Sequence, residues 1–227
     1  MSLTREDLIE GRIEQMVLEA QRLGLMTWLP PEERERSRRA ILTQFGDAEI
    51  WVFGYGSLMW NPCIHYLDRQ PARLYGYHRS FCLRTPLGRG TPEHAGLVLA
   101  LEAGGSCHGI AFRVDPALAD YELTLVWNRE MVSGAYVPRL VTIHTPLGRR
   151  RAVTFAINHE HSRYAGRLSP EETAATIAVA AGALGSCAEY LFSTVAHLDE
   201  LGVGDGPMHR LQRLVEDYRA TTIAAAD

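Results

Sequence analysis

Residues 51–62 read W-V-F-G-Y-G-S-L-M-W-N-P, an apolar strand that runs directly into a loop with two glycines. Glycine permits backbone conformations that are closed to other residues, and it lets a ligand come close to the main chain. Successive N–H groups in such a loop can bind an anion, for example a carboxylate or an oxyanion. The alternative is a tight turn between two strands with no ligand. The loop is therefore a candidate anion-binding site.

Two stock motifs do not fit this loop. Gly54 and Gly56 match the first two glycines of a dinucleotide-binding G-x-G-x-x-G, but Met59 stands in the third place. Ser57 is not followed by the glycine that the G-x-S-x-G turn of α/β-hydrolases requires. A serine nucleophile at Ser57 remains only as an alternative.

The chain beyond the loop consists first of strand-like runs and later of helical runs. Gly and Pro separate short apolar runs typical of strands, at residues 72–76, 80–84, 96–101, 109–114, 137–145 and 152–157, with a turn at 103–106. Helices are expected from 116 to about 128, from 170 to about 183, and over 188–201 and 207–219. The second of these begins with a capping box formed by Ser169 and Glu172. The order of strands before helices predicts an α+β fold with a mostly antiparallel, barrel-like sheet.

The first 48 residues form an expected helical leader. Apolar residues at helical spacing predict one stripe, comprising Ile9, Ile13, Met16, Val17, Ala20 and Leu23. Thr4 with Asp7 resembles a capping box, and Pro31 can open a second helix that ends near Phe45. We expect residues 1–48 to pack as an extension on the body or on another subunit, and residues 49–220 to form the main domain.

Composition excludes several functions. The 23 basic residues are all arginine, so a Schiff-base lysine and a P-loop lysine are both ruled out. A net charge of −4 gives no support to nucleic-acid binding. No apolar run approaches the roughly 20 residues that span a bilayer. Because the four cysteines show no C-x-x-C spacing and the first residues are polar, we expect reduced thiols and a cytoplasmic protein.

A second candidate site lies in residues 125–136, L-V-W-N-R-E-M-V-S-G-A-Y, where a helix is expected to end. Apolar neighbours such as Trp127 and Met131 can desolvate Glu130 and raise its pKa. Arg129 is adjacent in sequence but need not face the carboxylate. The alternative is a solvated glutamate at a helix terminus.

Two other polar clusters have ordinary interpretations. His159 and His161 would share one face of a strand, as two metal ligands can, but no H-E-x-x-H motif or third ligand is evident. A polar turn is the favoured interpretation, and residues 149–151, three arginines, are interpreted as a solvated turn. We expect no metal.

Several segments together resemble the ChaC family of γ-glutamylcyclotransferases, in particular its bacterial branch. The matching segments are residues 53–62, 76–84 (G-Y-H-R-S-F-C-L-R), 127–131 (W-N-R-E-M), 134–136 (G-A-Y) and 182–192 (G-A-L-G-S-C-A-E-Y-L-F). The resemblance runs from about residue 50 to about 218. One departure is Cys187, where the family pattern has asparagine, and this can alter substrate affinity if that asparagine orders the loop or reaches the substrate.

The resemblance implies a mixed β-barrel flanked by helices and a lyase that degrades glutathione to 5-oxoproline and cysteinylglycine. The substrate's own α-amine would attack its γ-carbonyl, so the enzyme needs no nucleophile and no cofactor. Glu130 is implied as the acid/base, and backbone N–H groups around Tyr55, Gly56, Ser57 and Leu58 as the substrate-binding loop. Further substrate-binding residues implied are Tyr136 and Tyr190, each of which can instead be a core aromatic.

Other functions stay open on the sequence. The substrate can be another γ-glutamyl amino acid or amine, or the chain can be a non-catalytic regulator of cation transport. A hydrolase that uses Ser57 or a cysteine is a further alternative, and it would release glutamate. The expected partner is small-molecule glutathione, with no nucleic acid and no membrane.

Overall fold

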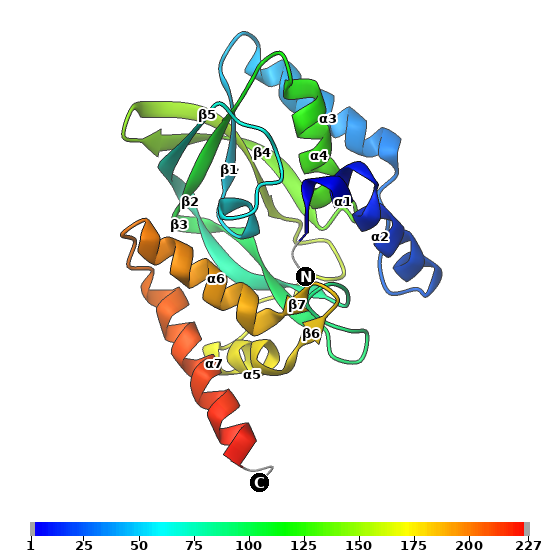
Figure 1. Cartoon of the computed structure of the whole chain (residues 1–227), viewed down its shortest axis with the longest axis vertical. Coiled ribbons are helices and arrows are strands. Elements are labelled where there is room, and N and C mark those ends of the chain that lie inside the picture. The colour runs from blue at the N-terminus through cyan, green and yellow to red at the C-terminus, as the bar shows by residue number, and fades with distance from the viewer. Residues whose placement is uncertain (1–2, 225–227) are drawn as a thin grey trace. The chain divides into compact units, whose positions relative to one another are not determined.

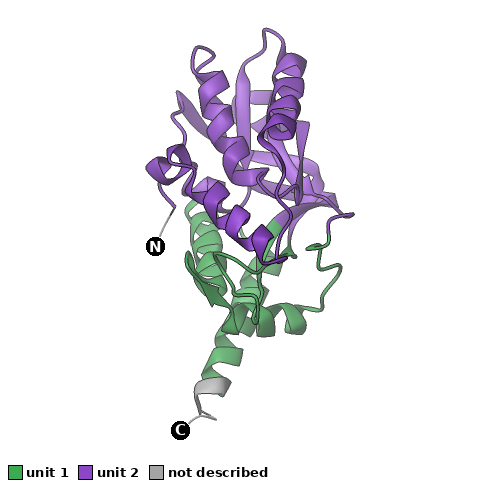
Figure 2. Cartoon of the chain, turned by 90° about the vertical axis from the view of Figure 1, so that its right-hand side faces the viewer, with its two compact units in different colours: residues 1–2, 81–99, 162–227 green, residues 3–80, 100–161 purple. Residues whose placement is uncertain are grey.

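The computed structural model describes residues 3–224, and it divides into two compact units (Figure 2). The larger unit comprises residues 3–80 and 100–161, and the smaller one residues 81–99 and 162–224. Residues 3–48 of the leader therefore belong to the same compact unit as the candidate loop and Glu130. The expected domain boundary near residue 49 stays a prediction.

Five strands close into a barrel (Figure 1). They are β1 (Ile50–Gly54), β2 (Asp68–Thr85), β3 (Gly96–Val114), β4 (Tyr136–Thr145) and β5 (Gly148–Ile157), in the order β1-β3-β2-β4-β5. β1 is antiparallel to β3 but parallel to β5, so the barrel is mixed. The α+β prediction and the barrel are confirmed.

Two expected strand breaks are wrong. Residues 72–76 and 80–84 lie in the single strand β2, and the expected turn at 103–106 lies inside β3. Gly76, Gly104 and Gly105 all have positive φ. Glycine in this conformation bends a strand without ending its ladder, as at a β-bulge. The glycines that suggested turns therefore mark bends in long strands.

Four helices and one 3₁₀ turn complete the larger unit. They are α1 (Arg5–Ile9), α2 (Arg12–Arg22), α3 (Pro31–Phe45) and α4 (Ala119–Glu130), with the 3₁₀ turn at Ser57–Met59. Trp127 of α4 packs edge-on against Phe155 of β5, with ring centroids 5.2 Å apart. Such aromatic pairs add about 0.5–1.5 kcal/mol to the burial of their surface, and this one anchors the last turn of α4 on the barrel.

In the leader, the predictions from capping residues are confirmed, but the prediction of one continuous apolar stripe is wrong. The Thr4 capping box and the helix start at Pro31 are both confirmed. The single stripe is wrong, because Gly11 with φ +71° separates α1 from α2. Ile9 and Leu23 are consequently 53% and 69% exposed.

The smaller unit is mainly helical. It contains α5 (Pro170–Val179), α6 (Cys187–Glu200) and α7 (Gly206–Ala224), with a two-stranded ribbon of β6 (Ala181–Gly182) and β7 (Gly185–Ser186). The Ser169 capping box of α5 is confirmed. The ribbon ends α5 earlier than expected.

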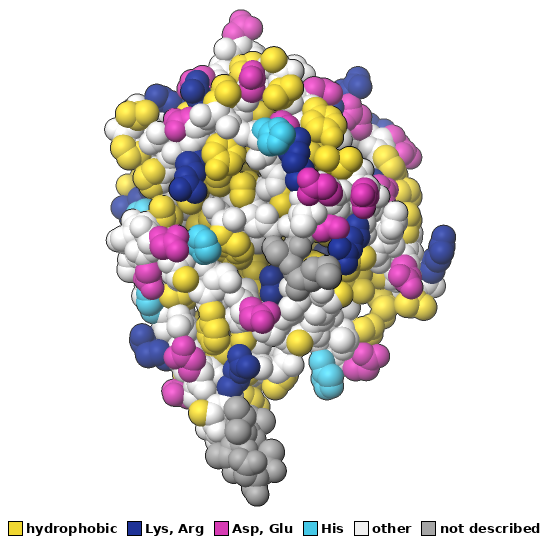
Figure 3. All heavy atoms as spheres, viewed as in Figure 1, with side chains coloured by type: hydrophobic (Ala, Val, Ile, Leu, Met, Phe, Trp, Pro, Cys, Tyr) yellow, Lys and Arg dark blue, Asp and Glu magenta, His cyan; other side chains and the backbone are white. Residues whose placement is uncertain are grey.

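The described surface carries mixed charge. On the face shown in Figure 3, acidic and basic side chains are interspersed. Among the described residues, no helix combines the length and the apolar character that a membrane crossing needs.

Candidate active site

Glu130 is the last residue of α4. Its side chain is only 15% exposed, and the apolar residues near it in sequence, Trp127, Met131 and Val132, are buried as well. Burial raises the pKa of the Glu130 carboxyl, and the neighbouring Arg129 guanidinium only partly offsets this effect. The interpretation as a solvated glutamate is wrong, and the expected upward pKa shift is confirmed.

The candidate loop is folded tightly onto itself. It leaves β1 at Gly54 and enters the 3₁₀ turn at Ser57. A Cβ atom on Gly54 would lie 2.8 Å from the Leu58 Cβ, closer than real Cβ atoms approach. Gly56 has φ −134°, so the loop does not use the positive φ that glycine allows at this position. Close backbone packing at Gly54 is the reason that the loop needs glycine there.

The Arg129 guanidinium connects this loop to Glu130. Its Nε lies 3.0 Å from Glu130 Oε1, and its Nη2 donates to Ser57 Oγ at 2.8 Å. Its Nη1 donates to the Asn61 carbonyl. Sequence reasoning missed this role, since adjacency along the chain does not reveal that the two neighbouring side chains turn toward each other. One rigid cation thereby joins the candidate acid to both ends of the 57–61 segment.

A second buried arginine supports the other end of the loop. Arg79 Nη1 donates to the Tyr55 carbonyl at 2.6 Å, and Nη2 donates to the His108 carbonyl. Arg79 is buried. Arg79 and Arg129 thus place two guanidinium groups against the loop, and charges act more strongly where water is excluded.

The remaining candidate residues of the larger unit differ in which of their groups can contact a ligand. Tyr55 and Leu58 are buried, and the Tyr55 hydroxyl donates to the Phe155 carbonyl at 2.7 Å, so these two can offer a ligand only their backbone. Ser57 Oγ accepts from a guanidinium, which cannot act as a base, so this contact does not activate it as a nucleophile. Tyr136 is half-buried and begins β4, just after the turn that follows Glu130.

Tyr190 lies in α6 of the smaller unit. It is buried there against the Phe81 ring at a centroid distance of 5.8 Å, with the Arg89 guanidinium 5.6 Å from its own ring centroid. These contacts fit a core aromatic of that unit. A role for Tyr190 in closing the site stays a prediction.

Cys187, at the position where the family pattern has asparagine, is a buried link within the smaller unit. Its Sγ lies 3.1 Å from the Arg89 carbonyl oxygen and 3.3 Å from the Leu97 nitrogen. A Cβ on Gly96 would lie 2.4 Å from the same sulfur. Burial raises the pKa of the thiol, so Cys187 stays protonated and holds the 89–97 segment in place.

His159 and His161 turn to different partners. His161 Nε2 lies 2.9 Å from Thr27 Oγ1 and 3.1 Å from the Ser133 carbonyl oxygen. His159 Nε2 lies 3.8 Å from Glu102 Oε1. The two rings are thus used in separate contacts.

The chain is similar in sequence to known proteins. The family model described as ChaC-like protein matches residues 50–218. A glutathione-specific γ-glutamylcyclotransferase of Escherichia coli is 40% identical over 182 residues, 79% of each chain. Glutathione-specific γ-glutamylcyclotransferase 1 of Mus musculus is 30% identical over 171 residues, 71% of this chain and 76% of the relative.

A solved structure supports the fold. The crystal structure of a yeast γ-glutamylcyclotransferase specific to glutathione matches with a TM-score of 0.69 at 23% identity, over 76% of this chain and 98% of that one. The γ-glutamylcyclotransferase-like barrel predicted from the sequence is confirmed.

Proposed function

The chain belongs to the ChaC-like family, and on this premise we propose that it is a glutathione-specific γ-glutamylcyclotransferase with Glu130 as its acid/base. The observation that carries the proposal is the Arg129 guanidinium, which joins the Glu130 carboxylate to the Ser57 hydroxyl. The buried Glu130 carboxylate and the 57–61 loop are thereby linked through a single guanidinium group.

The reaction is an intramolecular transfer. The α-amine of the γ-glutamyl group attacks its own γ-carbonyl, forming the lactam C–N bond, and the bond to the cysteine nitrogen breaks. Glu130 takes a proton from the attacking amine and then gives it to the departing amine, so a single carboxylate serves both steps. Because the nucleophile belongs to the substrate, the enzyme contributes mainly by holding the chain folded.

The raised pKa of Glu130 suits this double role. A carboxylate with an ordinary pKa is a weak base toward an ammonium group and a poor acid toward a leaving amine at neutral pH. Burial raises the pKa of Glu130 while Arg129 keeps the ionised form accessible. Proton transfer in both directions is thus closer to balance.

The loop is the proposed binding region for the substrate's negative charge. Backbone N–H groups at the start of a 3₁₀ turn have no acceptor within the turn itself, and Ser57–Met59 begins such a turn in the loop. The Gly56, Ser57 and Leu58 N–H groups are the proposed donors to the α-carboxylate or to the oxyanion of the tetrahedral intermediate. Arg79 and Arg129 add their positive charge from the protein side.

Tyr136 and Tyr190 are retained as proposed substrate contacts, with no metal or organic cofactor. The proposed location is the cytoplasm, since the four described cysteines are free thiols and reducing compartments keep thiols in that state.

Product analysis in H₂¹⁸O tests the proposed reaction. Glutathione should yield 5-oxoproline and cysteinylglycine without added ¹⁸O, because the new bond comes from the substrate's own nitrogen. Labelled glutamate would instead establish hydrolysis and overturn the proposal. A parallel reaction with γ-glutamylalanine should be much slower, and equal turnover would broaden the substrate to γ-glutamyl amino acids in general.

A further inference from the structure

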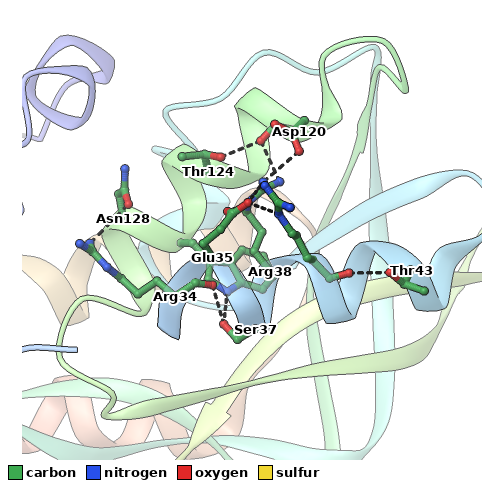
Figure 4. Close-up of polar contacts among 10 residues, drawn as sticks. Arg34, Glu35, Ser37, Arg38, Thr43, Asp120, Thr124 and Asn128 are labelled. Atoms are coloured by element: carbon green, nitrogen blue, oxygen red, sulfur yellow. Dashed lines mark hydrogen bonds and ion pairs between the residues drawn. The ribbon is translucent and has the colours of Figure 1, made fainter. Parts of the chain in front are cut away.

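The leader, residues 3–48, contacts the chain on both sides of Glu130. Before Glu130, Trp127 Nε1 donates to Ser37 Oγ at 2.7 Å, and Arg34 Nη1 donates to Asn128 Oδ1 at 3.3 Å. Figure 4 shows Arg34 reaching across from α3 to Asn128 of α4. The last turn of α4 is therefore bound to α3 by two side-chain contacts.

After Glu130, the leader binds two successive carbonyl groups. The Leu29 N–H donates to the Val132 carbonyl at 2.9 Å, and the Thr27 hydroxyl donates to the Ser133 carbonyl at 2.9 Å. His161 Nε2 lies 3.1 Å from the same Ser133 oxygen. The turn that leads away from Glu130 is consequently fixed from the side of the leader.

The contacts between α3 and α4 are buried and electrically balanced, whereas Thr27 is an exposed residue that reaches the buried Ser133. Arg34 is 3% exposed, and its Nη2 forms a 2.6 Å ion pair with Glu14, which also accepts from Trp28 Nε1. Trp127 is 1% exposed. Hydrogen bonds shielded from water hold geometry more strongly than exposed ones, so the contacts of Arg34 and Ser37 are well suited to restrain the last turn of α4.

We propose that the leader is a positioning element of the active site, which fixes the Glu130 carboxylate through Thr27 and Ser37. The inference rests on the proposed acid/base role of Glu130. The family model begins only at residue 50, so the match to the family does not include these contacts. Proton transfer in a closed site depends on sub-ångström placement, and a shift of about 1 Å can cost 100-fold in rate.

Deletion of the leader would be a poor test. Arg5, which lies in the leader, pairs with Glu122, and the Glu122 side chain is 1% exposed. Deleting the leader would remove Arg5 and leave this buried carboxylate without its cation. Two hydroxyl deletions are gentler: Thr27→Val removes the donor to Ser133, and Ser37→Ala removes the acceptor of Trp127. The two are combined because His161 also contacts the Ser133 carbonyl.

The double variant Thr27→Val/Ser37→Ala should lower kcat about tenfold, as expected for two weakened hydrogen bonds. KM should change less than about twofold, because the loop is untouched. Hydrogen exchange should accelerate over residues 127–134 and stay unchanged in β1. Thr27→Ser keeps the hydroxyl and should retain wild-type kcat.

Thr43→Val is the matched control. The Thr43 hydroxyl also lies in the leader, but it donates to the Arg39 carbonyl of its own helix. This variant should keep kcat and exchange rates at the wild-type level.

Three outcomes would overturn the proposal: a kcat of the double variant within about twofold of wild type, an equal loss in Thr43→Val, or a loss fully explained by the unfolded fraction. If Glu130→Gln is inactive while the double variant is fully active, only the leader proposal fails. If Glu130→Gln itself stays active, the acid/base role fails first.

Discussion

The pKa values of two carboxyl groups on helix α4, Glu122 and Glu130, are shifted in opposite directions. Glu122, in the first turn of α4, is buried, and three donors hold it: Arg5 Nη1 at 2.6 Å, Arg5 Nη2 at 2.7 Å and the His65 N–H at 3.0 Å. Glu130, at the other end, has the Arg129 Nε at 3.0 Å. The pKa of Glu122 is lowered and that of Glu130 is raised.

The difference teaches that burial beside an arginine does not decide the protonation of a carboxyl group. Burial pushes the pKa of both groups upward, and it is the largest single influence on each. For Glu122 the Arg5 hydrogen bonds and the His65 N–H together outweigh it. At Glu130, Arg129 divides its donors between the carboxylate and the loop. Direct donors therefore favour the ionised form of Glu122, whereas burial favours the protonated form of Glu130.

The largest expected effect comes from Glu130→Gln. The amide keeps the size of the side chain but removes the proton acceptor, so amine activation and leaving-group protonation fail together. We expect kcat for 5-oxoproline formation to fall about 10²–10⁴-fold, with glutathione binding retained in calorimetry. Turnover within about threefold of wild type would contradict the acid/base role.

Glu122→Gln should have the complementary effect, on stability. It leaves the partly buried Arg5 guanidinium without its anion, and breaking a buried pair costs about 3–5 kcal/mol. Because Arg5 is 17% exposed, we expect the lower end, about 3 kcal/mol, in urea unfolding. The folded fraction should retain near-normal kcat. A selective loss of kcat with unchanged stability would remove the distinction between the two carboxylates.

Arg129→Met tests the comparison between Glu122 and Glu130, because it removes the cation that is paired with Glu130. Since Arg129 lowers the pKa of Glu130 against the effect of burial, its loss should raise that pKa further. The acidic limb of the kcat/KM profile should then move to higher pH, and kcat/KM at neutral pH should fall about 10–100-fold.

Arg129→Lys provides the matched control, since it keeps the charge but cannot reach three acceptors at once. In Arg129→Lys the acidic limb of the kcat/KM profile should return close to its wild-type position, whereas kcat/KM at neutral pH should recover only in part. An unchanged limb in Arg129→Met would mean that Arg129 does not influence the ionisation of Glu130.

Local signals in the sequence were the most reliable ones. The capping boxes at Thr4 and Ser169 depend on residues three apart, and both formed. The position of Glu130 at a helix end followed from the same kind of short-range pattern. Such features depend on nearby residues alone and can therefore be recognised without the fold.

Features that depend on distant residues could not be predicted in this way. The direction of the Arg129 side chain is set by Ser57 and Asn61, about 70 positions earlier in the chain. The sequence predicts strand ends at Gly76 and Gly104, because only the closed barrel shows that pairing continues past these glycines. The contacts of Thr27 with the Ser133 carbonyl and of Ser37 with Trp127 likewise required the folded leader.

The smallest expected effect is a gain in stability of Glu130→Gln that depends on pH. A carboxyl whose folded pKa is raised contributes its stability at low pH, below the unfolded value of about 4.3. That contribution is lost as pH rises through the folded pKa, since ionising the buried group is costly. Glutamine resembles the protonated acid and does not ionise, so the variant avoids this loss.

The melting temperature of Glu130→Gln should therefore exceed that of wild type at about pH 8, and the gap should narrow toward about pH 5 as the native carboxyl becomes protonated. Single stabilising substitutions commonly yield about 0.5–2 kcal/mol, and for a chain of this size each kcal/mol raises Tm by about 2–4 °C. Glu122→Gln should show the opposite sign: its lowered folded pKa gives stability above the unfolded value, so its deficit is largest at neutral pH and shrinks in acid. Calorimetric scans of both variants between about pH 5 and pH 8 measure how the difference in Tm from wild type changes with pH for each variant. Parallel slopes would mean that the two carboxylates are held alike, and the contrast between a structural and a catalytic glutamate on α4 would fail.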